Sequence, residues 1–68
     1  MKSGVVKWFH QAKGYGYIKP EDGSDDVFVF YPSIVAEGFK SLSSGQFVKF
    51  ESSQNLSGNI EATKVYVS

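Results

Sequence analysis

Apolar and polar residues alternate along several short stretches of the chain, which is the pattern of β-strands with one buried and one exposed face. This alternation predicts strands over residues 5–9, 14–19 and 27–31, and again over 46–51 and 60–67. No segment of about ten residues has the periodicity of a helix. The pattern therefore predicts an all-β fold.

The segments between the predicted strands are rich in turn-forming residues. A short connection over 10–12 joins the first two strands, and 20–25 should close a hairpin onto the third. Pro32 then removes a backbone donor, and 33–38 has room for a single helical turn that ends at Gly38. Five short strands would leave exposed edges in an open sheet, so we expect a closed five-stranded antiparallel barrel.

The second and third predicted strands carry aromatic rings on one face. Alternation places Tyr15 and Tyr17 on the same side as Lys13, whose charge marks the side that meets solvent. Phe28 and Phe30 separate in the same way from the valines of the third strand. A folded protein that exposes such rings usually stacks them against a ligand, so we expect a stacking surface here.

The chain is too small to bury all of its aromatic side chains. Its 68 residues are expected to form one domain, 1–68, and folding hides about 60% of the surface of so short a chain. The composition includes one Trp, four Tyr and six Phe. We expect Phe47 or Phe50 in the core and the rings beside Lys13 on the surface.

The formal net charge is +0, but the charged residues are distributed unevenly. Residues 21–26 are rich in acids, whereas the only charged side chains of residues 1–19 are those of Lys2, Lys7, Lys13 and Lys19. A local positive patch can attract phosphate groups even on a neutral protein. Alternatively, these lysines keep the edges of short strands soluble.

The sequence lacks the chemistry of an enzyme or a metal site. It has no cysteine and one histidine, which excludes disulfides and thiolate or zinc sites, and no cofactor is expected. No paired nucleophile and base and no phosphate-cradling loop are present. No apolar run approaches the roughly 20 residues that span a bilayer, and the start lacks the apolar segment of a signal peptide, so we expect a cytoplasmic protein without a membrane partner.

Several of these motifs together resemble the bacterial cold-shock proteins and the related domain of the Y-box proteins. The likeness rests on residues 4–18, on 26–29 and on the loop 37–42 that leads to Gly45 and Gln46. These motifs have the order and spacing of the family and cover nearly the whole chain. The resemblance implies an OB-fold barrel that binds single-stranded RNA and single-stranded DNA. It implies an RNA chaperone of the stress response, and in some members a transcription antiterminator or regulator.

The resemblance also implies which residues contact the nucleic acid. Aromatic side chains would stack on bases, lysines would hold the backbone, and a carboxylate would meet a base edge. The residues that carry these roles are Lys7, Trp8, Lys13, Tyr15, Tyr17, Asp26, Phe28, Phe30, Tyr31 and Phe39. Phe9 is expected at the margin of this surface, in a monomer that takes no small-molecule substrate.

The chain departs from the family pattern at several positions. Tyr15 and Tyr17 stand where Phe is common, which keeps the stacking faces and adds hydroxyls. Phe30 replaces the usual histidine, so a titratable donor is absent there. Ser57 stands where some members have an arginine, which predicts weaker phosphate attraction on that side. His10, at a position that is usually Asn or Asp, is interpreted as a surface or turn residue.

Three other functions fit parts of the sequence. The string over 13–18 also resembles the first ribonucleoprotein motif of an RRM, but that fold needs two helices, which the pattern lacks. A small protein-interaction barrel could grip an apolar or proline-rich peptide with the same rings, although it would not need the interleaved lysines. The third alternative is an OB barrel that binds a small molecule.

Overall fold

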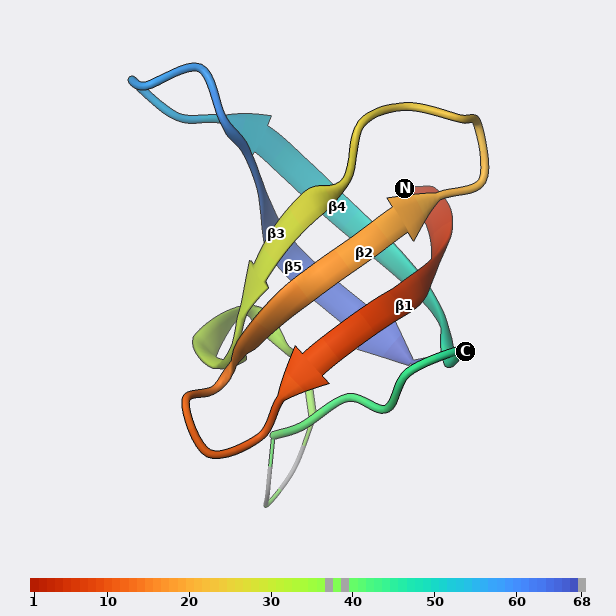
Figure 1. The fold of residues 1–68 in the computed structure, drawn as a ribbon, viewed down its shortest axis with the longest axis vertical. Coiled ribbons are helices and arrows are strands. Elements are labelled where there is room, and N and C mark those ends of the chain that lie inside the picture. Colours follow the sequence, from red (N-terminus) through yellow and green to blue (C-terminus); the bar gives the residue numbers. More distant parts are fainter. Residues whose placement is uncertain (37, 39, 68) are drawn as a thin grey trace.

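The computed structural model describes residues 1–36, 38 and 40–67. This part of the chain contains five β-strands and one short 3₁₀ helix, joined by loops and turns (Figure 1). The elements are β1 (Lys2–His10), β2 (Tyr15–Pro20), β3 (Val27–Phe30), η1 (Tyr31–Ser33), β4 (Phe47–Gln54) and β5 (Ile60–Val67). All five predicted strands are confirmed, and β1 and β4 are longer than predicted. Within the described ranges, no helix has the length and hydropathy needed to cross a membrane.

The strands close into a barrel in the order β1-β2-β3-β5-β4. Four of the neighbouring pairs are antiparallel, whereas β3 and β5 run parallel, with Phe28 paired to Glu61. A closed ring with an odd number of strands cannot alternate direction all the way round, so at least one pair must be parallel. The predicted all-β, five-stranded OB-fold barrel is confirmed, and its antiparallel pairing is interrupted at this single seam.

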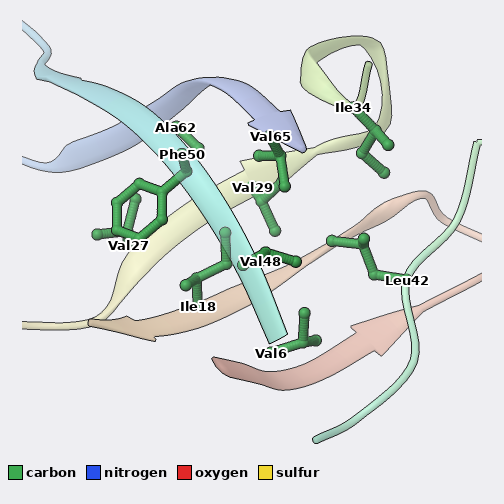
Figure 2. Packing of buried hydrophobic residues seen from close by; sticks show 10 residues of the cluster. All are labelled: Val6, Ile18, Val27, Val29, Ile34, Leu42, Val48, Phe50, Ala62 and Val65. Atoms are coloured by element: carbon green, nitrogen blue, oxygen red, sulfur yellow. The ribbon is translucent and has the colours of Figure 1, made fainter. Parts of the chain in front are cut away.

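The core consists of inward-facing side chains from all five strands and two residues between β3 and β4 (Figure 2). These buried residues are Val6, Ile18, Val27, Val29, Ile34, Leu42, Val48, Phe50, Ala62 and Val65. In β4, Phe50 is 0% exposed and Phe47 is 62% exposed. The two residues point to opposite faces because they are an odd number of positions apart. The sequence predicts one of these two residues in the core, and the structure shows that it is Phe50.

Gly16 allows a close approach between β1 and β2. It pairs with Phe9, and a Cβ atom at Gly16 would lie 2.1 Å from the carbonyl oxygen of Trp8 and 2.8 Å from the Cα of Phe9. Any side chain at this position would therefore push the two strands apart.

Gly14, which the sequence predicts inside the second strand, instead has a φ of 77° and ends the turn before β2.

The helical turn after β3 lies earlier than the sequence predicts. η1 spans Tyr31–Ser33 with Pro32 in its first turn, not the predicted range 33–38. It ends because Ile34 has an extended backbone, is buried, and forms a parallel bridge to Val65 of β5. The burial of Ile34 in the core and its bridge to β5 therefore end the helix after Ser33.

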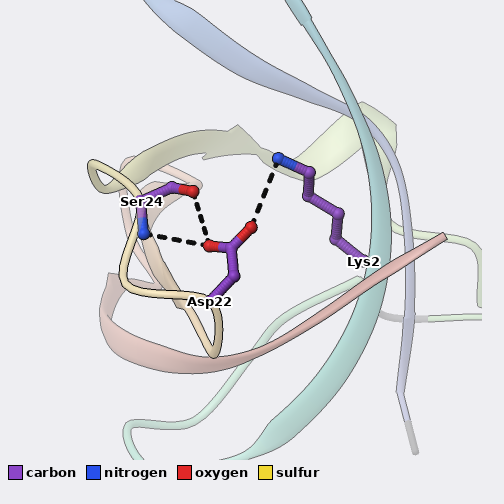
Figure 3. A network of polar contacts seen from close by, with 3 residues as sticks. All are labelled: Lys2, Asp22 and Ser24. Carbon is purple, nitrogen blue, oxygen red and sulfur yellow. Dashed lines mark hydrogen bonds and ion pairs between the residues drawn. The ribbon is translucent and has the colours of Figure 1, made fainter.

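Asp22 holds the loop between β2 and β3 (Figure 3). Its Oδ1 accepts hydrogen bonds from the hydroxyl and the backbone N–H of Ser24, and Nζ of Lys2 lies 3.6 Å from its Oδ2. The Ser24 hydrogen bonds, together with the positive charge of Lys2, lower the pKa of Asp22 below its ordinary value of 3.8. The predicted hairpin is confirmed, since β2 and β3 pair antiparallel on either side of this loop.

Candidate nucleic-acid interface

Four aromatic side chains form a continuous cluster on the outer surface of β1, β2 and β3. The ring centroid of Trp8 lies 5.4 Å from that of Tyr17 and 5.6 Å from that of Tyr15. The Phe28 centroid lies 5.7 Å from Tyr17 and 5.9 Å from Tyr15. The strand register produces this order, because Trp8 pairs with Tyr17 and Tyr17 pairs with Phe28. These four side chains are called the aromatic face below.

A bulge in β1 turns Trp8 toward the aromatic face. The pairing of β1 with β2 shifts between Val6 and Trp8, which makes Lys7 an extra residue in β1. Simple alternation would put Trp8 on the same side as the buried Val6, but the bulge leaves its side chain 38% exposed. Phe9 is half-buried and packs against the core.

Two further rings extend from one end of the aromatic face. Phe30 pairs with Tyr15 at the end of β3, and its ring centroid lies 5.1 Å from that of Tyr31, the first residue of η1. Both side chains are exposed. Gly14 makes room for Tyr31, since a Cβ at Gly14 would lie 2.8 Å from Cδ1 of the tyrosine ring. The carbonyl of Gly14 also accepts a 2.8 Å hydrogen bond from the Tyr31 N–H.

His10 lies beside the aromatic face. Its ring is 4° from parallel to that of Tyr15, with the centroids 6.2 Å apart. Its Nδ1 accepts a 3.2 Å hydrogen bond from the backbone N–H of Lys13, and its carbonyl accepts a 2.7 Å bond from the N–H of Gly14. These bonds agree with the interpretation of His10 as a turn residue. Its stacking on Tyr15 was missed, because the β1–β2 register that pairs the two residues follows from the bulge.

Two of the predicted site residues form an ion pair with each other. Nζ of Lys7 lies 2.8 Å from Oδ2 of Asp26, and the two side chains are 55% and 34% exposed. The pair connects the bulge of β1 to the residue before β3. The ammonium group of Lys7 is therefore partly neutralised by the protein itself.

A depression of about 440 Å³ lies beside Tyr31, at the end of the aromatic face. Its lining residues include Lys13, which the sequence predicts for the site, and Lys40, which it does not. A depression lined by a ring and two lysines suits a nucleotide, since the base can stack while the phosphate meets a positive charge. Phe39, predicted for the same region, lies outside the described residues.

A second depression, of about 310 Å³, lies beside Tyr17 and Phe28. Its other lining residues are Asp26, Asn55, Asn59, Ile60 and Glu61. Sequence reasoning missed Asn55 and Glu61, because only the parallel pairing of β3 with β5 brings Glu61 next to Phe28. The one available signal is the alternation around the buried Ala62, which places Glu61 on the outer face of its strand.

The chemistry of this surface is that of stacking. Among residues 1–36, 38 and 40–67 there is no group of three His, Cys, Asp or Glu side chains that could hold a metal ion. In the same ranges no buried side-chain nitrogen or oxygen lacks a hydrogen-bond partner. Tyr15, Tyr17 and Phe28 are half-buried and Trp8 is exposed, and partly accessible rings with a few polar groups around them are suited to flat, conjugated ligands.

Comparison with known proteins finds a matching family and several similar proteins. The 'Cold-shock' DNA-binding domain family matches residues 2–68. The cold shock-like proteins CspE of Buchnera aphidicola (subsp. Acyrthosiphon pisum, strain APS) and of Escherichia coli (strain K12) are each 53% identical to the chain over 55 residues. That alignment covers 81% of this chain and 80% of each relative. The cold shock-like protein CspD of Escherichia coli (strain K12) is 46% identical over 59 residues, which is 87% of this chain and 80% of the relative.

Proposed function

The chain belongs to the family of cold-shock DNA-binding domains, and from this premise we propose that its aromatic face binds single-stranded RNA and single-stranded DNA by stacking on unpaired bases. The observation that carries the proposal is the unbroken contact between Trp8, Tyr17 and Phe28 across three adjacent strands. Each ring of such a surface offers a place for one base, and every base has a flat face. The sites are therefore tolerant of sequence.

The preference for single strands follows from the shape of the surface. In a duplex each base already stacks on its neighbours, so the base faces are covered and only the edges are accessible. The rings of the aromatic face are fixed on a sheet and cannot enter a groove as a helix does. Bases must therefore be unpaired before these rings can contact them.

Stacking supplies most of the affinity in this proposal. Each stacked base contributes about 1–3 kcal/mol, so three or four bases support micromolar to nanomolar binding after the ordering costs are subtracted. Lys13 and Lys40 lie where they can hold the backbone beside Tyr31, and Asp26 lies where it can meet a base edge beside Tyr17. The depression beside Tyr31 would therefore hold sugar and phosphate groups, and the depression beside Tyr17 and Phe28 would receive a base edge.

A protein with this preference can change RNA structure without hydrolysing ATP. By binding open strands it shifts weak hairpins toward the open form through mass action. We therefore assign to it the role of a cytoplasmic RNA chaperone, active as a monomer, with no small-molecule substrate and no membrane partner. Opening a terminator hairpin in the same way would make it a transcription antiterminator or regulator. Cold-shock proteins catalyse no reaction, and the protein is not an enzyme.

Trp8 is the only tryptophan and lies within the aromatic face, so its fluorescence tests the proposal directly. The titrants are oligothymidine, oligoadenosine, a duplex of the two and a proline-rich peptide, with the anisotropy of labelled ligands as a second readout. We expect both single strands to bind and quench the fluorescence, and the duplex and the peptide to do neither. Binding of the peptide alone would replace the proposal with a protein-interaction barrel, and binding of no strand would end it.

A further inference from the structure

Glu61 stands where it can contact a base that lies on the aromatic face. It pairs with Phe28 across the parallel seam of the barrel, and both residues line the 310 Å³ depression together with Tyr17. A base that stacks on Tyr17 or Phe28 turns its face to the ring and its edge to the wall of this depression. Two acidic residues, Asp26 and Glu61, are among the residues that line this depression. An edge contact of this kind is what distinguishes one base from another.

The loop before β5 fixes the position of the Glu61 carboxylate. Nδ2 of Asn55 donates a 2.9 Å hydrogen bond to Oε1 of Glu61. Oδ1 of Asn55 in turn accepts hydrogen bonds from the backbone N–H groups of Ser57 and Asn59, each 3.0 Å long. The loop thus orients the amide, and the amide orients the carboxylate. Because an ionised carboxylate has about four acceptor positions, Glu61 can still accept from a ligand.

The two carboxylates of the depression differ in their partners. Asp26 accepts from the ammonium group of Lys7 at 2.8 Å, so its charge is balanced by a cation. The partner of Glu61 is the neutral amide of Asn55, which leaves its charge intact. Hydrogen bonds to an uncompensated carboxylate are stronger than those to a neutral acceptor. Glu61 is therefore the stronger acceptor that the depression offers to a ligand.

We infer that Glu61 makes this depression selective for bases with an exocyclic amino group, namely cytosine, adenine and guanine, over uracil and thymine. The amino group of cytosine is a donor that Glu and Asp side chains accept from. Uracil has carbonyl oxygens on both sides of its single ring N–H, and these oxygens repel a carboxylate. The inference rests on the proposed function, since it needs a base stacked on the aromatic face.

Oligocytidine and oligouridine of equal length separate the edge contact from stacking, because both are pyrimidines. We expect the wild-type protein to bind oligocytidine about 5- to 10-fold more tightly, the lower part of the discrimination that one good base-edge contact provides. In Glu61→Gln the side-chain oxygen can still accept from Asn55, and its NH₂ group becomes a donor that suits the uracil oxygen. The ratio of the two affinities should therefore fall to about 1 or below.

Glu51→Gln is the matched control. Glu51 is also exposed, lies on the neighbouring strand β4 opposite Lys64, and is absent from the depression, so its replacement changes the net charge equally. The ratio should keep its wild-type value in this variant, and thermal unfolding should confirm that all three proteins are folded. An equal ratio in wild type and Glu61→Gln would overturn the inference while leaving the proposed function intact. If neither strand binds any of the proteins, the proposed function itself fails.

Discussion

Nζ of Lys7 lies 2.8 Å from Oδ2 of Asp26, so the lysine that precedes Trp8 in the chain is already paired with a carboxylate. Lys13 is exposed in the turn before β2 and takes part in no ion pair with any residue of the described ranges. The two lysines are equivalent in the sequence pattern but differ in the charge that they can offer to a phosphate.

This difference should appear in the salt dependence of binding. If about three phosphates are neutralised, log affinity should fall with log salt with a slope of about −2. Lys13→Gln should make the slope shallower by about 0.7, the value for one phosphate of a single strand, and Lys7→Gln should change it less. Oligothymidine titrations over a range of salt concentrations measure both effects. A wild-type slope steeper than about −5 would mean that charge, not stacking, dominates.

The stacking role of Phe28 can be tested against an exposed ring outside the aromatic face. Phe28→Ala should weaken oligonucleotide binding by about 1–3 kcal/mol, roughly 5- to 150-fold, because one stacking position is lost. Phe47→Ala removes a side chain that is 62% exposed on β4, opposite Val5, and should leave the affinity unchanged. Fluorescence titration of Trp8 measures both variants. Equal losses in the two variants, or no loss in Phe28→Ala, would remove Phe28 from the site.

Gly16→Ala should destabilise the barrel. Its Cβ would lie 2.1 Å from the carbonyl oxygen of Trp8, a backbone atom that can move only if β1 moves. Forcing extra volume into a packed position costs about 1–3 kcal/mol, a large share of the roughly 3–10 kcal/mol that holds a domain of this size. Urea unfolding measures the loss. Gly23→Ala is the comparison, since a Cβ there has no atom within 4 Å and only its φ of 82° opposes the change; we expect a smaller effect.

The hydrogen bonds of Asp22 should make stability depend on pH at the acid end. The pKa of this carboxyl is below 3.8 in the folded protein, so the unfolded chain binds more protons as the pH falls through 3.8. The stabilisation is therefore complete above the ordinary pKa and is lost as the pH falls through the folded value. We expect wild type to melt at a higher temperature than Asp22→Asn at neutral pH and the gap to close in acid.

The charge change itself needs a control in this experiment. Asp25→Asn removes the same charge from the same loop and should show no comparable gap, because Ser24 bonds to Asp22. A gap between wild type and Asp22→Asn that stays constant down to about pH 2 would contradict the assignment.

Alternation alone was enough to predict most of the aromatic face. It separates Tyr17 from the buried Ile18, and Phe28 from the buried Val27 and Val29, because the backbone of these two strands is regular. The strand positions follow for the same reason. Phe50 could not be told from Phe47 in this way, since the register of β4 against its neighbours decides which of the two faces inward.

The remainder of the site depends on features that a linear pattern does not contain. The bulge at Lys7 reverses the alternation of β1, so the outward direction of Trp8 and the inward packing of Phe9 follow from the pairing of two strands. Glu61 reaches Phe28 only because the closed barrel has a parallel seam. Both features arise from tertiary structure. Alternation alone would have turned Trp8 inward, so only the family resemblance predicted it for the site, and Glu61 was missed.

Because consecutive residues of a strand point in opposite directions, the side chains that we propose for ligand recognition and the side chains that keep the barrel folded are different residues. Tyr17 and Ile18 are neighbours in sequence, yet one meets solvent and the other the interior. Evolution or an engineer can therefore exchange the outer rings, or Glu61 at the seam, one at a time. Such exchanges can change which oligonucleotides the protein binds while the barrel and its melting temperature stay nearly the same.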